Sequence, residues 1–234
     1  MNSTFEVRHP QHVYFERIVK HLQARDRWLD IGCGRQLVPW WLQGKCELES
    51  KLKSRVRWLV GVDPDLDALR DNRSCHLRLK ADTSALPFAD GSFDIVTSNM
   101  VFEHVENPEA ILPEIRRVLR RRGRFIVLTP NWLDIVTIAA WAVPNLLHPA
   151  FVSRIEARGK EDVYPTHFRF NRRGAVEKML QGARFAHCRV ELLDQPDTYH
   201  HVPVFAHIES AWHGLARRWP ALRGALLIEA EAGN

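Results

Sequence analysis

The sequence lacks the spacing patterns of a metal centre or a disulfide framework. Its four cysteines form no Cys-x-x-Cys pair and no cysteine–histidine cluster suited to zinc. We therefore expect no metal site, and we expect a reducing, cytoplasmic compartment because structural disulfides are rare there. The polar start of the chain contains no apolar segment of the kind found in signal peptides, so no secretion signal is expected.

A hydrophobic run long enough to cross a membrane is also missing. The most apolar stretch, Trp132–Leu147, is interrupted by Asp134 and Pro144, and a spanning helix needs about 20 apolar residues. Three interpretations stay open for this stretch: a lid, a helix of the core, or a segment that lies on a membrane surface.

Lysine is scarce, since it supplies only seven of the 33 basic residues. The chain carries a net charge of +5, so its surface is expected to be rich in arginine. Runs such as Arg120–Arg122 are either simply solvated or attract phosphate groups and an anionic membrane surface, as a peripheral contact. Because no continuous basic helix with interleaved aromatic residues is present, no nucleic-acid partner is expected.

What the sequence does contain is enough for one domain. Its 234 residues are 45% hydrophobic and 26% charged, as in an ordinary globular protein. Strand-like and helix-like segments alternate as far as Asn131, which is typical of a parallel sheet with helices on both faces. We expect a single domain over residues 1–234, with a core at 25–131 and a less regular part at 132–224.

The hydrophobic pattern predicts the individual elements. Strands are expected at 27–31, 58–62, 76–80, 93–98, 124–128, 186–193 and 225–230, and helices at 14–24, 37–43, 66–72 and 172–181. The charged residues 45–55 are either a surface helix or an insertion. The clearest helix begins at Pro108, with Asn107 as its N-cap. Gly123 is expected to end that helix in the left-handed conformation.

Distinctive residues fall where three successive strands end. The first strand is followed by a glycine turn, Gly32-Cys33-Gly34, in which backbone N–H groups can approach a ligand closely. Asp30, two residues before this turn, can accept a hydrogen bond from a ligand ammonium group, directly or through water. Asp63 can bind both hydroxyls of a ribose, and Asp82 can accept from an adenine amine. Taken singly, Asp63 and Asp82 are equally well explained as turn or N-cap residues, but together the three carboxylates indicate one nucleoside-shaped cleft.

Further short motifs follow in a fixed order. They are Gly61-Val62-Asp63, Ala81-Asp82 with Leu86-Pro87-Phe88, Ser92-Phe93-Asp94-Ile95-Val96, Glu103-His104-Val105 and Glu114-Ile115-Arg116-Arg117-Val118-Leu119. With Asp30-Ile31-Gly32-Cys33-Gly34, they resemble the class I S-adenosylmethionine-dependent methyltransferases, in particular the methyltransferase type 11 group. The resemblance covers roughly residues 25–131.

The resemblance implies an α/β, Rossmann-like fold with a seven-stranded, mostly parallel sheet whose last strand is antiparallel. It implies S-adenosyl-L-methionine as the cofactor. The site residues that it implies are Asp30 with the loop Gly32, Cys33 and Gly34, Asp63 and Pro64 at the ribose, Asp82 and Thr83 beside the adenine, and Asn99 near the methionine part.

The sequence departs from the family pattern at three places. Gln36 stands where a further glycine is common, and Arg121-Arg122-Gly123 replaces a Pro-Gly-Gly turn. Met100 stands where related O-methyltransferases that use a metal carry a glutamate, which again argues against a metal.

The expected activity is methyl transfer, in the first place O-methylation, to a small-molecule or a lipid- or glycan-linked acceptor. His104 and His167 are the candidate general bases, because a neutral imidazole suits proton transfer near pH 7; packing or surface roles are the alternative for both. Apolar residues between Trp132 and Phe151, with Arg154, Arg158 and Arg169 near them, either line an apolar or anion-binding acceptor pocket or merely cover the core.

Two other functions fit parts of the pattern. An NAD(P)-dependent oxidoreductase also has a glycine turn followed by an acid, but its fingerprint requires a glycine where this chain has Leu37. A family member that binds the cofactor without catalysing transfer is the second alternative, and Gln36 keeps it open.

Overall fold

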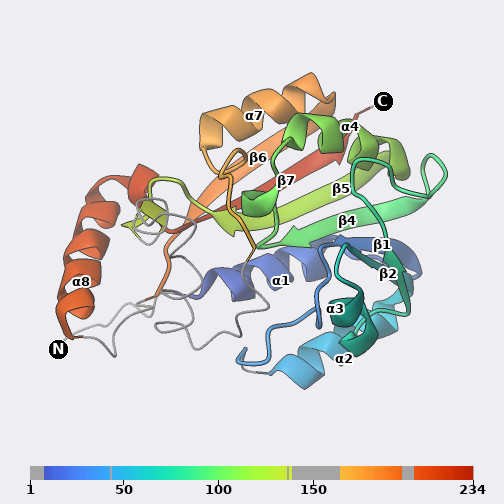
Figure 1. Ribbon diagram of the computed structural model, residues 1–234, viewed down its shortest axis with the longest axis horizontal. Coiled ribbons are helices and arrows are strands. Elements are labelled where there is room, and N and C mark those ends of the chain that lie inside the picture. Colours follow the sequence, from blue (N-terminus) through green and yellow to red (C-terminus); the bar gives the residue numbers. More distant parts are fainter. Residues whose placement is uncertain (1–7, 43, 136, 139–163, 197–202, 234) are drawn as a thin grey trace.

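The computed structural model describes residues 8–42, 44–135, 137–138, 164–196 and 203–233 (Figure 1). Seven strands form one sheet in the order β3-β2-β1-β4-β5-β7-β6. The strands are β1 (Asp26–Ile31), β2 (Val56–Asp63), β3 (Leu77–Lys80), β4 (Phe93–Asn99), β5 (Leu119–Pro130), β6 (Phe185–Leu193) and β7 (Ala225–Ala232). The first five strands pair in parallel, whereas β7 runs antiparallel to both β5 and β6. The expected fold class is therefore confirmed.

Helices cover both faces of this sheet (Figure 1). They are α1 (Pro10–His21), α2 (Lys45–Arg55), α3 (Leu66–Asp71), α4 (Pro108–Val118), α7 (Arg173–Gly182) and α8 (Pro203–Arg218), with the short 3-10 helices η1 (Phe102–His104) and η3 (Pro220–Leu222). On one face α4 and α7 pack on the sheet, and on the other α1, α2 and α3 do so. Each face of the sheet has its own hydrophobic core. Leu29 of β1 lies in the core with α4 and α7, whereas the neighbouring Trp28 lies in the core with α1. Successive side chains of a strand point to opposite faces, which explains this division.

The helix expected at residues 37–43 does not form in the described part of that segment. Residues 35–42 are turns and bends, with Leu37, Val38 and Leu42 buried and Trp40 77% exposed. Pro39 lies in this segment, and a proline disfavours the helical conformation of the residue before it, here Val38. The three buried apolar residues are therefore held in a loop and not in a helix.

Gly123 does not end the helix that begins at Pro108. That helix ends at Val118, and the chain passes directly into β5, which contains Gly123. Arg122 is the residue with positive φ, 61°. A Cβ on Gly123 would stand 2.9 Å from the Arg120 carbonyl oxygen, so this close backbone contact requires a glycine. Gly123 lies where the pairing of β5 with β4 is irregular.

In the described part of the chain, none of the helices has both the length and the apolar character needed to cross a membrane. Most of the apolar stretch Trp132–Leu147, together with Phe151, Arg154 and Arg158, lies outside the described residues.

Candidate functional site

The candidate site lies at the carboxyl edge of the sheet, around the end of β1. β1 pairs with β2 on one side and with β4 on the other, so the order of strands reverses there. The last residue of β1, Ile31, is level with Val62 and Ser98, and Asp63 is level with Lys80 at the end of β3. The residues that follow these strands therefore share one edge, where open α/β sheets bind their ligands.

The glycine loop after β1 is tightly bent and open on one side. Gly32 has φ 68° and Gly34 has φ 49°. A Cβ on Gly32 would lie 2.3 Å from Val101 Cγ2, whereas a Cβ on Gly34 would meet nothing within 4 Å. Gly32 is thus required by packing, and Gly34 leaves its backbone accessible to a ligand.

Asn72, which sequence reasoning missed, holds this loop. Its Nδ2 donates to the carbonyl oxygens of Cys33, at 3.1 Å, and Gly34, at 2.9 Å. Its Oδ1 accepts from the backbone N–H groups of Ser74 and Cys75. The thiol of Cys33 is buried against that of Cys75, and this contact together with burial raises the pKa of Cys33. Cys33 therefore contributes only its backbone to the loop's open side.

Asp30 is a buried carboxylate within β1. It accepts a hydrogen bond from Thr97 Oγ1 at 2.6 Å, and Thr97 in turn accepts one from Trp28 Nε1. Burial, together with the nearby charge of Asp63, raises the pKa of Asp30 to about 7. No basic side chain in the described residues forms an ion pair with it. A buried carboxylate without a cation is costly, so a cationic ligand would stabilise it.

Asp63 connects the end of β2 to the glycine loop. Its Oδ2 accepts from the Gly34 N–H and its Oδ1 from the Asp65 N–H, both at 2.9 Å. Burial raises the pKa of Asp63, and these two backbone bonds oppose that rise. Each carboxylate oxygen can accept a second hydrogen bond, so Asp63 can bind a diol and hold the loop at once.

Asp82 differs from these two carboxylates in its environment. It is exposed, two residues beyond β3, and its Oδ1 accepts from the Ser84 N–H at 2.8 Å. That backbone bond lowers the pKa of Asp82. Asp30 and Asp63 interact electrostatically, whereas Asp82 forms a turn on the rim, beside Thr83. Pro64 is exposed between Asp63 and Asp65.

Asn99 ends β4 and is paired with Gln11 at the start of α1. Each side-chain amide donates to the other at 2.8 Å. Gln11 is buried, and His9, which caps α1, contacts the Trp41 ring with centroids 4.7 Å apart. The beginning of α1 is therefore part of the site, although a glutamine in the first turn of a helix gave no signal in the sequence.

His104, in η1, is oriented by a main-chain carbonyl. Its Nδ1 lies 2.9 Å from the Pro165 oxygen. A carbonyl oxygen only accepts, so Nδ1 carries the proton and Nε2 is the basic nitrogen of the neutral ring. Nε2 is 3.9 Å from Oε1 of the buried Glu103. The protonated ring would therefore have a carboxylate beside it.

Glu103 also fastens the segment that contains His167. Its backbone oxygen accepts from the N–H groups of His167, at 2.7 Å, and Phe168, at 3.0 Å. Its Oε2 accepts from Thr129 Oγ1 at 3.0 Å, and Asn171 donates to the same hydroxyl. The His167 backbone thus joins the site, while its side chain is exposed.

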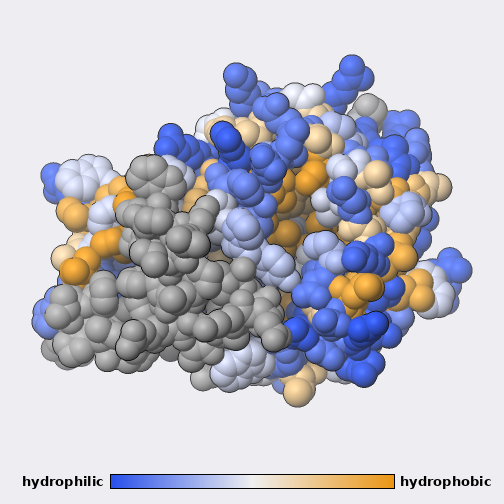
Figure 2. Space-filling model, in the orientation of Figure 1, coloured by the Kyte–Doolittle hydropathy of each residue, from blue (hydrophilic) through white to orange (hydrophobic). Residues whose placement is uncertain are grey.

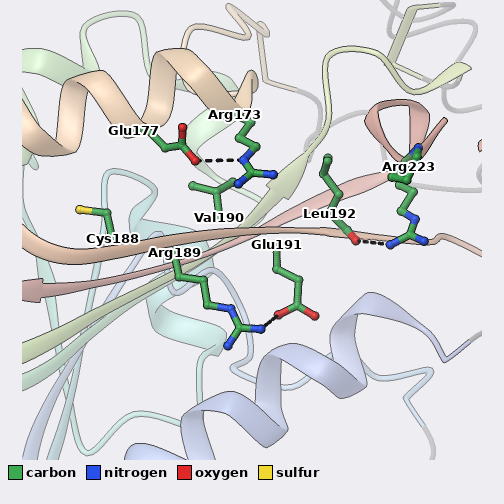
Figure 3. A pocket seen from close by; sticks show the side chains of 9 residues that line it. Arg173, Glu177, Cys188, Arg189, Val190, Glu191, Leu192 and Arg223 are labelled. Atoms are coloured by element: carbon green, nitrogen blue, oxygen red, sulfur yellow. Dashed lines mark hydrogen bonds and ion pairs between the residues drawn. The ribbon is translucent and has the colours of Figure 1, made fainter.

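A separate hollow of about 380 Å³ opens along β6, between α7 and η3 (Figure 3). Its charged residues are largely paired with one another, as Arg173 is with Glu177 and Arg189 with Glu191. No residue of the candidate site lines it, and β6 is the edge strand opposite β3.

Comparison with known proteins gives the same assignment for the core. Residues 29–127 match the family model described as a methyltransferase domain. The malonyl-(acyl-carrier protein) O-methyltransferase of Erwinia pyrifoliae is 32% identical over 54% of this chain and 47% of that protein. A probable S-adenosylmethionine-dependent methyltransferase of Mycobacterium tuberculosis is 30% identical over 51% of this chain and 40% of that protein. The chain thus spans less than half the length of these relatives.

Solved structures share the fold over nearly the whole chain. The YcgJ protein from Bacillus subtilis has a TM-score of 0.56 at 17% identity, over 95% of this chain and 99% of that chain. A second similar structure is the geranyl diphosphate C-methyltransferase of Streptomyces coelicolor, solved with Mg²⁺, geranyl diphosphate and S-adenosyl-L-homocysteine. It has a TM-score of 0.59 at 19% identity, over 94% of this chain and 77% of that chain. Residues 29–127 thus match a methyltransferase domain, and the chain shares its fold with solved S-adenosylmethionine-dependent methyltransferases.

Proposed function

We propose that this protein transfers a methyl group from S-adenosylmethionine to an oxygen of a small-molecule or lipid- or glycan-linked acceptor. The observation that carries the proposal is the buried, cation-free Asp30 beside the open glycine loop and Asp63. This arrangement matches a ligand with an ammonium group at one end and a ribose at the other. A nicotinamide dinucleotide offers no primary ammonium to Asp30, which favours the methyl donor over the oxidoreductase alternative.

Each residue would have a distinct part in holding the cofactor. Asp30 would accept from the ammonium group, and the Gly34 backbone would approach the donor from the loop. Asp63 would bind the ribose hydroxyls beside Pro64, and the rim formed by Asp82 and Thr83 would face the adenine. Asn99, fixed by Gln11, would border the methionine part.

His104 is the proposed general base. The bound cofactor supplies an already activated methyl group, so the protein has to position the acceptor and remove its proton. With Nδ1 held by the Pro165 carbonyl, Nε2 can take that proton, and Glu103 at 3.9 Å would stabilise the resulting imidazolium. His167 is the second candidate, because its backbone is fixed next to this point.

An acceptor that is partly apolar and anionic fits the described surroundings. Leu133 and Met100 are 41% and 38% exposed. Arg172 lies over the Trp132 ring, 4.7 Å from its centroid, and Arg169 is exposed nearby in the chain. The acceptors named for two similar proteins, malonyl-acyl-carrier protein and geranyl diphosphate, belong to those proteins; both join an acyl or isoprenoid part to anionic groups, which supports this class here.

Contact with an anionic membrane surface is part of the proposal. α8 exposes Ile208, Leu215 and, just after its end, Trp219, at spacings that form one apolar stripe. Arg217 and Arg218 lie in its last turn, and hydrophobic atoms are visible over α8 at the left edge of Figure 2. Apolar and basic residues together suit an anionic bilayer.

Vesicle flotation tests this membrane contact. The protein is expected to float with vesicles that contain phosphatidylglycerol, and the double variant Ile208→Ser/Leu215→Ser to remain behind. Trp40→Ser, which removes the 77% exposed Trp40 away from α8, should float like the wild type. Flotation of the α8 variant equal to that of the wild type would refute this part of the proposal.

Calorimetry and a transfer assay test the main proposal. The protein should bind S-adenosylmethionine and not NADH, and it should release S-adenosylhomocysteine when given the small-molecule and lipid fractions of a cell extract with methyl-labelled donor. Donor binding without any labelled product would favour a non-catalytic member, and NADH binding would favour an oxidoreductase.

A further inference from the structure

Residues 164–168 connect two sides of the candidate site. The Tyr164 hydroxyl donates to Asp65 Oδ2 at 3.0 Å, next to the proposed ribose residue Asp63. The carbonyl oxygen of the adjacent Pro165 accepts from His104 Nδ1 at 2.9 Å. Two successive residues of one segment therefore bind a residue that follows β2 and a residue that follows β4.

The order of the strands shows where the segment 164–168 lies relative to the glycine loop. β1 lies between β2 and β4 in the sheet, and the glycine loop lies at its carboxyl end. A segment that bonds to Asp65 on one side and His104 on the other must cross the edge of the sheet at the glycine loop. It thus forms a bridge across the cleft in which the cofactor is proposed to bind.

The two ends of this bridge are fastened differently. On the β4 side the segment is held by the backbone bonds of His167 and Phe168 to Glu103, and Phe170 beyond them is fully buried. On the β2 side the hydrogen bond runs from Tyr164, which is 43% exposed, to an Asp65 side chain at the surface. An exposed hydrogen bond contributes little net free energy, so this end can open and close while the other stays in place.

The Asp65 carboxylate is already oriented for the bond. Its Oδ1 caps α3 by accepting from the N–H groups of Asp67, at 2.8 Å, and Ala68, at 3.2 Å. The other oxygen, Oδ2, is left facing Tyr164. The Tyr164 ring also contacts the His104 ring edge-on, with centroids 5.9 Å apart.

We propose that Tyr164 is a positioning residue that closes this bridge over the bound cofactor. The hydrogen bond of Tyr164 to Asp65 retains the cofactor, and the demethylated product of the cofactor, in the cleft. The Tyr164 ring and the adjoining Pro165 keep His104 directed at the acceptor. Cofactor exchange requires the Tyr164–Asp65 bond to open. This inference rests on the cofactor site proposed above.

Two variants isolate the bond. Tyr164→Phe removes the hydroxyl and keeps the ring against His104. Asp65→Ser keeps an oxygen that can cap α3, since serine is a good N-cap, but removes the oxygen that faces Tyr164. Asp67→Ser is the matched control, because Asp67 pairs with Arg70 in the same helix.

The measurement is the dissociation rate of S-adenosylhomocysteine by stopped-flow fluorescence. Both Tyr164→Phe and Asp65→Ser should release it about three- to tenfold faster than the wild type, as expected for one lost bond to a carboxylate. The double variant should be no faster than either single variant, because both remove the same interaction. The melting temperature and the rate for Asp67→Ser should stay at wild-type values.

Additive effects in the double variant, or an unchanged release rate in Tyr164→Phe, would overturn the bridge while leaving the proposed function intact. A wild-type protein that binds no S-adenosylhomocysteine would instead overturn the proposed function itself.

Discussion

The side-chain amides of Gln11 and Asn99 hydrogen-bond to each other in both directions, 88 residues apart in the sequence. This pair attaches the start of α1 to the end of β4, where the methionine part of the cofactor is proposed to lie. Helix α1 therefore does more than cover one face of the sheet, because its first turn fixes an amide of the site.

Replacing Gln11 with alanine should weaken binding of the methyl donor about tenfold, because Asn99 loses both bonds and is no longer held in one orientation. Calorimetric titration with S-adenosylmethionine measures this. Glu16→Ala, at an exposed position of the same helix, is the control and should bind normally. If Gln11→Ala binds as tightly as the wild type, Asn99 does not border the donor.

Binding of the donor should depend on the ionisation of Asp30. Burial raises the pKa of Asp30 to about 7, so the carboxylate that attracts an ammonium group is lost as the pH falls below that value. Affinity for S-adenosylmethionine should therefore fall by up to about tenfold for each pH unit below 7 and level off above it. The Asp30→Asn variant should bind weakly at every pH, with a flat profile.

The same group should affect folding stability in the opposite direction. The folded state holds the Asp30 proton more tightly than the unfolded state, whose pKa is near 3.8. The stabilisation that Asp30 provides is therefore fully present below pH 3.8 and is lost as the pH rises through about 7. Urea unfolding of wild type and Asp30→Asn across this window measures it, and a difference that does not change with pH would contradict the raised pKa.

The two glycines of the loop should respond differently to alanine. Gly32→Ala would place a methyl group 2.3 Å from Val101, so we expect a clear loss of stability, on the order of 2–4 kcal/mol, from overpacking together with the positive φ. Gly34→Ala meets no atom within 4 Å, so only the strain of its positive φ remains, about 1–2 kcal/mol.

Donor binding should be lost in Gly34→Ala, because its new methyl group occupies the open side of the loop. Thermal melting and calorimetry on both variants separate the two effects. A Gly34→Ala protein that binds the donor normally would show that the ligand does not approach this backbone.

His104→Gln should lower the rate of methyl transfer by about 10²–10⁴-fold, the usual loss when a general base is removed, and leave the affinity for the donor unchanged. The rate is measured as S-adenosylhomocysteine formed once an acceptor is known. His167→Gln is the companion variant, and a larger loss there would reassign the base.

The strands and their ends were predictable from the sequence because each rests on a local pattern. Buried parallel strands are nearly continuous apolar runs, and Asp30, Asp63 and the glycines mark their carboxyl ends directly. The antiparallel β7 was expected from the family resemblance, since its pairing with β5 and β6 is a property of the whole sheet. The errors at residues 37–43 and at Gly123 arose where a loop or a strand used residues that also suit a helix or a helix end. Helix α8 was not predicted, and α1 begins four residues before the helix expected at 14–24.

The residues that sequence reasoning missed act across long separations. Asn72 binds a loop 38 residues away, Gln11 binds Asn99, and Tyr164 reaches Asp65 across 99 residues. Each is an ordinary polar residue with no motif around it. Their roles depend on which strand ends the fold brings together, and that information lies in the topology of the sheet.

The position of β7 inside the sheet has a consequence for how the molecule assembles during synthesis. β5 and β6 are joined only through β7, so until residues 225–232 leave the ribosome β5 has an open edge. Strand β6, with α7 beside it, meanwhile has no strand to join, because β7 follows it only after α8 and η3. The open edge of β5 is therefore exposed to wrong pairing while the residues between β5 and β7 are synthesised, and the sheet is completed only by the last of its strands along the chain.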